Sequence, residues 1–204
     1  MKPKDLPEES RHLADFAERV MKQVSSARLA VATAESCTGG LLASLLTDLP
    51  GVSNGFERGF VTYAEQAKCE LLGIDPVLIR RHGVVSREIA AAMADGALAN
   101  SRAKVGVGIT GFAGPAGEGE AGLVYLAARR KGGRLYSREC HYGDVGRDRV
   151  RMLAAHAALD LIEESSAGRM SGGPGAYLPI GEVVGPVCWA AIWRGISWRP
   201  GPRV

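Results

Sequence analysis

The chain has 204 residues, of which 46% are hydrophobic and 23% charged, a composition typical of a globular domain with one sizeable core. Its formal net charge is +3 with acidic and basic residues interspersed, which argues against a nucleic-acid partner, and no segment predicts a membrane span or a secretory leader. The cysteines stand far apart, which favours reduced thiols in a cytoplasmic protein and argues against a metal site. They are Cys37, Cys69, Cys140 and Cys188.

The first half of the chain alternates between helical and strand patterns. Apolar residues recur at helical spacing over residues 9–25, which predicts an amphipathic helix, and the apolar run at 29–33 predicts a strand. Further helices are predicted near 40–49, over 65–72, from Asp75-Pro76 to Gly83 and over 87–101, with a strand over 55–63. Ser86 is expected to cap the helix that begins at 87.

The second half is richer in strands. Strands are predicted over 104–109, 123–129 and 134–142, and the Lys131-Gly132-Gly133 turn joins the last two into a hairpin. A glycine-rich loop over 110–120 separates the first two, and a helix is predicted over 147–163. Alternating strands and helices with one hairpin imply an α/β layered domain on a mixed sheet.

The composition changes after Glu164. Residues 165–204 hold five of the ten prolines, eight of the 27 glycines and all three tryptophans, without a clear period. We therefore divide the chain into a domain over 1–164 and a tail over 165–204. Such a segment rarely buries enough surface to offset its ordering entropy, which favours a poorly ordered tail over an oligomerisation arm or lid.

The segment from Ala34 to Gly40, with the sequence AESCTGG, connects the first predicted strand to the second predicted helix. Backbone N–H groups at a helix start have no intrahelical partner, so they suit an anion or the oxygen of a carbonyl under attack. Glycine at positions 39 and 40 lets a ligand approach the backbone closely. The motif alone allows two interpretations: Ser36 caps the helix, or Ser36 is a nucleophile.

Three segments are expected to converge at one edge of the sheet, where ligands of open α/β sheets bind. Ser36 offers a hydroxyl, which needs a nearby base before it attacks. Lys68 becomes such a base if burial lowers its pKa, and the Tyr63 hydroxyl can relay or donate a proton. Thr110 and Gly111 offer backbone N–H groups for an oxyanion. Taken alone, Lys68 is more typical of a solvated helix residue and Tyr63 of a half-buried strand aromatic.

Together these motifs resemble the C-terminal domain of the competence/damage-inducible CinA family, which also occurs as a free-standing amidohydrolase of nicotinamide mononucleotide (NMN). The matching segments stand in the family's order. They are Ala34-Glu-Ser-Cys-Thr-Gly-Gly40, Val61-Thr-Tyr63 with Lys68, Leu71-Leu-Gly73, Gly83-Val-Val-Ser86 with Ala91-Ala-Met-Ala94, and Thr110-Gly-x-Ala-Gly-Pro115.

The resemblance implies a three-layer α/β/α fold with a mixed, mostly parallel sheet, and a cytoplasmic homo-oligomer. It also implies hydrolysis of NMN to nicotinate mononucleotide and ammonia without a metal or cofactor, with Ser36, Tyr63 and Lys68 at the catalytic positions. The Gly39-Gly40 helix start and an arginine are expected to hold the 5′-phosphate. The positions predicted to bind substrate are Glu35, Cys37, Thr38, Gly39, Gly40, Thr110, Gly111 and Arg147.

Several alternatives stay open at this point. Arg147, Arg149 and Arg151 all follow Gly143-Asp144, and Arg147, at the predicted helix start, is favoured for the phosphate. The segment 115–122 is shorter than the family's loop and lacks its lysine, which favours as the alternative function a nucleotide-sensing or interaction module without turnover. Cys37 is a further candidate nucleophile, although no thiolate-stabilising partner is predicted beside it.

The four histidines show neither metal-ligand nor catalytic spacing. His12, His82, His141 and His156 are therefore predicted to be structural or surface residues.

Overall fold

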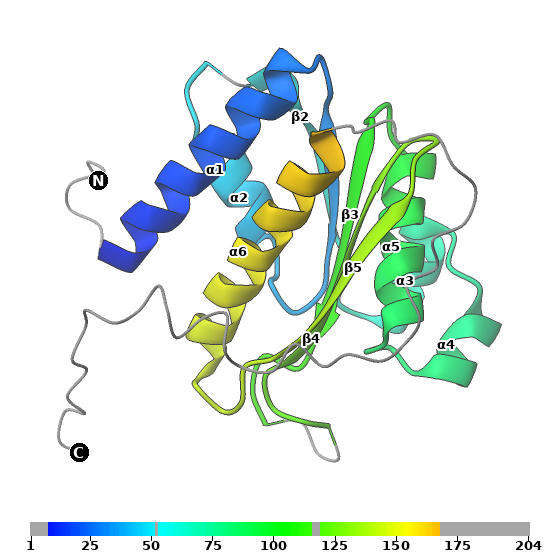
Figure 1. Ribbon diagram of the computed structural model, residues 1–204. Helices are drawn as coiled ribbons and strands as arrows, with labels where there is room; N and C mark the ends of the chain where they lie inside the picture. The colour runs from blue at the N-terminus through cyan, green and yellow to red at the C-terminus, as the bar shows by residue number, and fades with distance from the viewer. Residues whose placement is uncertain (1–7, 52, 116–118, 168–204) are drawn as a thin grey trace, which may run out of the picture. The chain divides into compact units, whose positions relative to one another are not determined.

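The computed structural model describes residues 8–51, 53–115 and 119–167. Its centre is a five-stranded sheet in the order β2-β1-β3-β4-β5 (Figure 1). The strands are β1 (Val31–Glu35), β2 (Phe56–Val61), β3 (Val105–Gly111), β4 (Leu123–Arg130) and β5 (Leu135–His141). β1 pairs in parallel with β2 and β3, and β4 and β5 form an antiparallel hairpin beside β3. The predicted mixed sheet and hairpin are confirmed.

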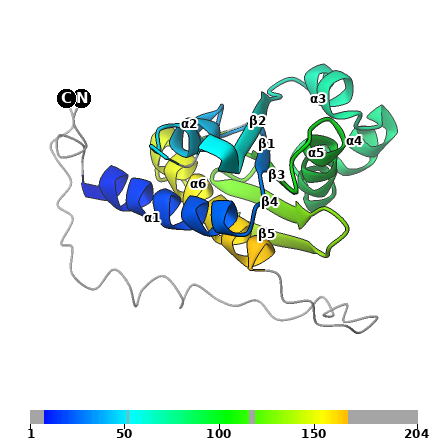
Figure 2. The ribbon, with the colours of Figure 1, turned by 90° about the horizontal axis from the view of Figure 1, so that it is seen from above.

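Helices cover both faces of this sheet. They are α1 (Glu8–Ser26), α2 (Leu41–Thr47), α3 (Glu65–Leu72), α4 (Pro76–His82), α5 (Arg87–Ala99) and α6 (Arg147–Ser166), with a short 3₁₀ helix, η2 (Ser53–Gly55). Figure 2 shows α1, α2 and α6 on one side of the strands and α3, α4 and α5 on the other. The three-layer α/β/α architecture is therefore confirmed.

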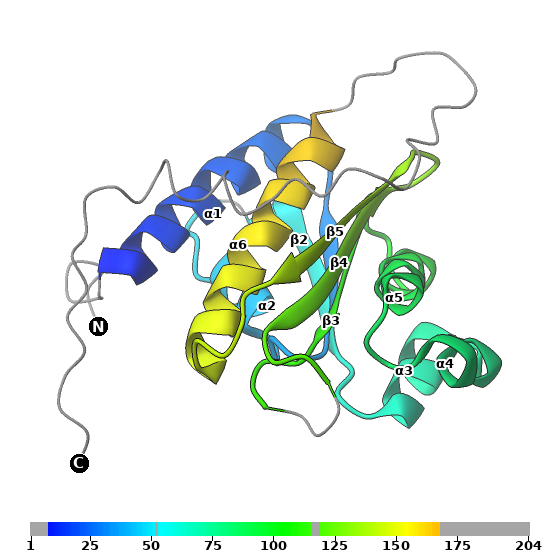
Figure 3. The same ribbon diagram turned by 60° about the horizontal axis from the view of Figure 1, so that its bottom comes forward.

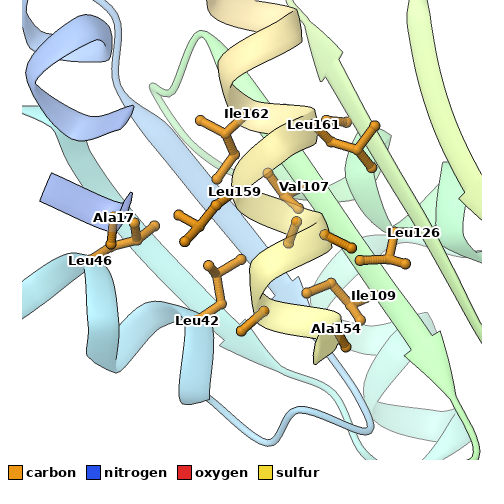
Figure 4. Close-up of a cluster of buried hydrophobic side chains, with 14 of the residues drawn as sticks. Ala17, Leu42, Leu46, Val107, Ile109, Leu126, Ala154, Leu159, Leu161 and Ile162 are labelled. Atoms are coloured by element: carbon orange, nitrogen blue, oxygen red, sulfur yellow. The ribbon is translucent and has the colours of Figure 1, made fainter. Parts of the chain in front are cut away.

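An apolar cluster joins the sheet to the layer of α1, α2 and α6 (Figure 4). Val105, Val107 and Ile109 of β3 face this layer, because alternate residues of a strand point to the same side. Helix α6 contributes Leu159 and Ile162, both fully buried. The buried face of α6 thus packs this layer onto the sheet. It also fixes the position of Arg147, the first residue of the helix, at the end far from Leu159 and Ile162.

The opposite face of β3 allows helix α5 to pack very close to the strand. Gly106 and Gly108 lie under α5, and a Cβ added at Gly108 would lie 2.1 Å from the carbonyl oxygen of Ala90. Only glycine permits this contact between strand and helix. Ala32 and Ala34 of β1 extend the same flat surface. Small residues on this side of the sheet therefore hold α5, and the segment that leads into it, close to the strand ends.

Local signals placed the shorter helices correctly. α3 ends at Gly73, which adopts a left-handed φ of 68°, and the Asp75 side chain accepts a hydrogen bond from the N–H of Val77 at the start of α4. Ser86 caps α5 by accepting from Ile89 N–H, as predicted. These caps are local, which explains why the sequence located them.

Three elements extend two or more residues beyond their predicted ends, while the other boundaries agree or differ by shorter extensions or by shortening of the element. β1 extends to Glu35 instead of ending at 33, because it lies between β2 and β3 and pairs with both as far as Glu35. β3 runs to Gly111, since the hairpin strand β4 pairs with it beyond 109. α6 continues to Ser166, whose hydroxyl accepts a hydrogen bond from the Gln23 side chain at 2.8 Å. All three extensions depend on partners distant in the sequence.

The tail predicted over 165–204 falls outside the described residues from 168 onward. Its two interpretations, and the domain division at 164, stay predictions. Within the described ranges, none of the helices has the length and apolarity needed to cross a membrane.

Candidate active site

A pocket of about 380 Å³ lies at the carboxyl ends of β1 and β3 and beside the segment that follows β2. This edge of the sheet comes forward in Figure 3. Among the predicted site residues, its lining includes Ser36, Tyr63, Lys68, Thr110, Gly111 and Arg147. The expected convergence of three segments at one sheet edge is confirmed.

Lys68 is the most unusual side chain of the pocket, because it is only 1% exposed. Its Nζ lies 3.1 Å from Ser36 Oγ, and it donates to the carbonyl oxygens of Thr62 at 2.7 Å and Tyr63 at 3.3 Å. Burial lowers the pKa of Lys68, against weaker opposing effects of nearby acidic groups. The interpretation of Lys68 as a solvated helix residue is therefore wrong.

These three contacts accommodate both protonation states of the amine, because an ammonium donates to all three oxygens. A neutral Lys68 has two N–H groups and one lone pair. Its two N–H groups donate hydrogen bonds to the carbonyl oxygens of Thr62 and Tyr63. The remaining direction on Nζ leads to the hydroxyl of Ser36. In its neutral form, Lys68 can therefore take the Ser36 proton directly.

The carboxylate of Glu35 occupies the start of α2. Glu35 is fully buried and accepts hydrogen bonds from the N–H groups of Gly40 at 3.0 Å, Leu42 at 3.1 Å and Ala43 at 2.8 Å. The N-cap residue of α2 is Gly40, without a side-chain cap of its own. The interpretation of Ser36 as the helix cap is therefore wrong, and Glu35 takes the N–H groups at which the sequence places the substrate phosphate.

Arg151 of α6 contacts the same turn from outside. Its Nε and Nη2 donate to the carbonyl oxygen of Thr38 at 3.1 and 2.8 Å. Thr38 itself is fully buried. Arg147 begins the same helix, is exposed and lines the pocket, as its predicted role requires. Arg147 therefore faces the pocket, whereas Arg151 binds the backbone of the turn before α2.

Thr110 and Gly111, at the end of β3, contribute to the pocket lining. The Thr110 hydroxyl donates to the carbonyl oxygen of Val84 at 2.7 Å, which ties the segment before α5 to the end of β3. Phe112 N–H donates to β4, at Leu123. Because successive N–H groups of a strand point in opposite directions, the N–H of Gly111 faces the β1 side, where Ser36 lies.

Cys37 lines the pocket but is not an activated thiol. It is 8% exposed and packs into the same apolar cluster as α6. Burial raises its pKa to about 12, against the weaker effect of the N–H groups of Cys37 and Thr38 beside the thiol. A thiolate is the reactive form of cysteine, so the interpretation of Cys37 as nucleophile is not supported.

Tyr63 lies in the lining with a side chain that is 71% exposed, so it is not the half-buried strand aromatic that its position suggests. The pocket also includes residues that the sequence analysis did not single out: Glu65, Val84, Val85 and Phe112. Val84, Val85 and Phe112 lie inside the recognised motifs, but apolar side chains carry no chemical signal in a sequence.

The described histidines lie outside the pocket lining. His141 contacts Glu120 and Glu139 at 2.8 and 3.2 Å, which raises its pKa, and His156 packs on the ring of Phe16. In the described ranges, no three or more His, Cys, Asp or Glu residues are grouped so as to hold a metal ion.

Comparison with known proteins gives consistent matches. The family model of the CinA C-terminal domain matches residues 13–166. A CinA-like protein of Akkermansia muciniphila is 46% identical over 153 residues, which are 74% of this chain but only 37% of that relative. The nicotinamide-nucleotide amidohydrolase PncC of Escherichia coli is 42% identical over 154 residues, which are 74% of this chain and 92% of PncC.

Solved structures agree with these sequence matches. The crystal structure of the competence/damage inducible protein CihA from Agrobacterium tumefaciens has a TM-score of 0.72 and 40% identity, covering 77% of this chain and 95% of that one. A CinA superfamily protein from Escherichia coli has a TM-score of 0.70 and 34% identity, covering 74% of this chain and 88% of that one.

Proposed function

The chain belongs to the CinA C-terminal domain family, and on that premise we propose that it hydrolyses the carboxamide of NMN to nicotinate mononucleotide and ammonia. The activity named for the 42% identical PncC supports this assignment. The observation that carries the proposed mechanism is the buried amine of Lys68, 3.1 Å from Ser36 Oγ in a pocket of about 380 Å³. That volume suits a small-molecule substrate.

The first step is acyl transfer to Ser36. Neutral Lys68 takes the proton of the Ser36 hydroxyl, and Oγ attacks the carboxamide carbon of the substrate. The carbonyl oxygen becomes an oxyanion, for which the N–H of Gly111 is the best-oriented donor, since the N–H groups of Cys37 and Thr38 lie beside the Cys37 thiol.

The second step returns the proton. Lys68, now an ammonium, donates its proton to the amide nitrogen, the C–N bond breaks and ammonia leaves. Water then attacks the acyl-enzyme with Lys68 again as base, which releases nicotinate mononucleotide and restores Ser36. Atoms balance as one amide plus one water giving one acid and one ammonia.

Tyr63 contributes in two ways. Its carbonyl oxygen accepts from Lys68 Nζ, and its exposed ring lies at the pocket mouth. Because Lys68 reaches Ser36 directly, proton transfer from Ser36 needs no relay through the Tyr63 hydroxyl. We assign that hydroxyl to hydrogen bonding with the substrate at the mouth of the pocket.

Arg147 is the proposed phosphate ligand. It lines the pocket at the start of α6, and its Nη2 would lie 3.7 Å from a Cβ added at Gly114, so the guanidinium lies beside the loop that follows β3. An arginine fork matches the geometry of phosphate oxygens. The Gly39-Gly40 helix start does not take this role, because Glu35 already occupies it.

Ammonia release from NMN, nicotinamide and NAD, each offered separately to the purified protein, tests the proposal. Release from NMN alone is expected. Binding of NMN by calorimetry without any ammonia would support instead the nucleotide-sensing module, which the short 115–122 segment favours. The homo-oligomeric state and the cytoplasmic location implied by the family resemblance stay predictions.

A further inference from the structure

We propose that Glu35 and Arg151 are positioning residues, which hold the Ser36–Gly40 turn from two sides and keep Ser36 Oγ within reach of Lys68. The inference rests on the proposed function in one respect, the role of Ser36 as nucleophile. Neither residue touches the reacting atoms. Both act on the backbone that carries Ser36.

The turn requires such support because its own sequence gives it little rigidity. Gly39 and Gly40 adopt φ angles of 59° and 91°, a region that only glycine visits freely. The helix that follows, α2, has seven residues, too few to be stable by itself. The position of Ser36 therefore depends on contacts from outside the turn.

Glu35 holds the turn on its inner side. The backbone of this residue is fixed in the sheet, where its carbonyl oxygen accepts from Thr62 N–H at 2.8 Å. Its carboxylate reaches over the turn and binds the first N–H groups of α2 with both oxygens, at 2.8 to 3.1 Å. Hydrogen bonds to a buried charge are strong, and losing them leaves the charge unsatisfied. One residue thus fixes both ends of the segment that contains Ser36.

Arg151 holds the turn on its outer side. Two nitrogens of the Arg151 guanidinium donate to the carbonyl oxygen of Thr38. The same oxygen accepts a hydrogen bond from Leu41 N–H at 3.2 Å. A Cβ added at Gly39 would lie 3.6 Å from Arg151 Nη2, so the guanidinium lies directly against the turn. A lysine at 151 keeps the charge but cannot reproduce this fork.

The two arginines of α6 have different roles in this proposal. Arg147 lines the pocket, whereas Arg151, one helical turn further on, binds backbone and not substrate. Loss of Arg151 should therefore slow the chemical step without weakening substrate binding. Loss of Arg147 should have the reverse effect.

Two readouts on the full-length chain test the proposal: steady-state hydrolysis of NMN, and the rate at which a fluorophosphonate probe labels Ser36. Labelling forms a P–Oγ bond and releases fluoride, with the Ser36 proton passing to Lys68, so it reports the nucleophile without NMN. We expect Arg151→Lys and Glu35→Gln to lower kcat and the labelling rate about 100-fold, with KM unchanged within about twofold. The pH midpoint of the rate should stay at its wild-type value, because Lys68 keeps its surroundings.

Arg129→Lys is the matched control, because it removes an arginine fork that binds Asp95 on another part of the fold. All rates are measured well below each variant's melting temperature. If Glu35→Gln does not fold, Arg151→Lys decides the question.

Wild-type kcat and labelling in Arg151→Lys would overturn the proposal, and so would a rise in KM at constant kcat, which would make Arg151 a substrate ligand. A wild-type protein that neither hydrolyses NMN nor labels at Ser36 would refute the nucleophile itself, and the positioning role with it. A wild-type protein that labels without hydrolysing NMN would refute only the substrate assignment.

Discussion

Lys68 Nζ and Ser36 Oγ lie 3.1 Å apart, although 32 residues separate them in the chain. The two side chains are 1% and 9% exposed, so water competes weakly for either group. The contact couples the protonation of the amine to the reactivity of the hydroxyl, which makes both the pH dependence and the mutational behaviour of this pair predictable.

The rate of NMN hydrolysis should rise with pH and then level off. Burial lowers the pKa of Lys68 below its ordinary value of 10.5, so the neutral, proton-accepting form grows as pH rises through that lowered pKa. Lys68→Arg keeps the charge but cannot deprotonate, and should be as inactive as Lys68→Ala. Rates from pH 6 to 10 check this. An active Lys68→Arg variant with a flat pH profile would remove lysine as the base.

Ser36→Ala should lower kcat by about a thousandfold or more while NMN still binds in calorimetry, because the substitution removes the proposed nucleophile and keeps the pocket. Cys37→Ala should retain most turnover, because the thiol has a pKa raised to about 12 and packs in the core. An active Ser36→Ala variant together with an inactive Cys37→Ala variant would identify Cys37 as the nucleophile.

Arg147→Ala should raise KM for NMN about 10- to 100-fold with little change in kcat, because the variant lacks the proposed charged hydrogen bonds to the phosphate, which lies outside the reacting centre. Nicotinamide riboside, which has no phosphate, is the matched control, and its kcat/KM should be the same for wild type and variant. Equal losses on both substrates would place Arg147 at the ring or ribose instead.

Gly108→Ala should destabilise the fold by about 3 kcal/mol, since the added methyl group has no room between β3 and α5. The clash at 2.1 Å is with the backbone oxygen of Ala90, which cannot rotate away. Gly114→Ala is the control, because its Cβ would meet only the end of the Arg147 side chain at 3.7 Å. Urea unfolding of the three proteins measures the difference, and equal midpoints would contradict this account of the β3–α5 contact.

A chain that ends after Ala167 should keep its melting temperature and its activity. The family match ends at residue 166, and the Gln23–Ser166 contact that ties α6 to α1 is retained. Calorimetry and ammonia release on the shortened chain test this. Loss of stability or activity would show that residues beyond 167 belong to the working domain.

Much of the site was predictable because local rules and short motifs determine it. The caps at Gly73, Asp75 and Ser86 place α3 to α5, and the parallel strands bring the Ser36 turn and Lys68 to one sheet edge. A serine after a buried strand and a lysine in the helix after the next strand made this pair a candidate, and the resemblance to the CinA family favoured it over a helix cap and a solvated lysine.

The tertiary structure alone decided how these residues are used. A sequence does not show that Lys68 is buried, because that depends on the layer of helices above it, and burial is what lowers its pKa. It likewise gives Glu35 and Arg151 as charged residues, which are usually solvent-exposed or bind ligands. Only the packing of α6 against the turn between β1 and α2 brings Arg151 to the Thr38 carbonyl, because a hydrogen bond across 113 residues depends on the completed fold. The hydrogen bonds of Glu35 are local in sequence, but its backbone is held in the sheet by the pairing of β1 with β2 and β3.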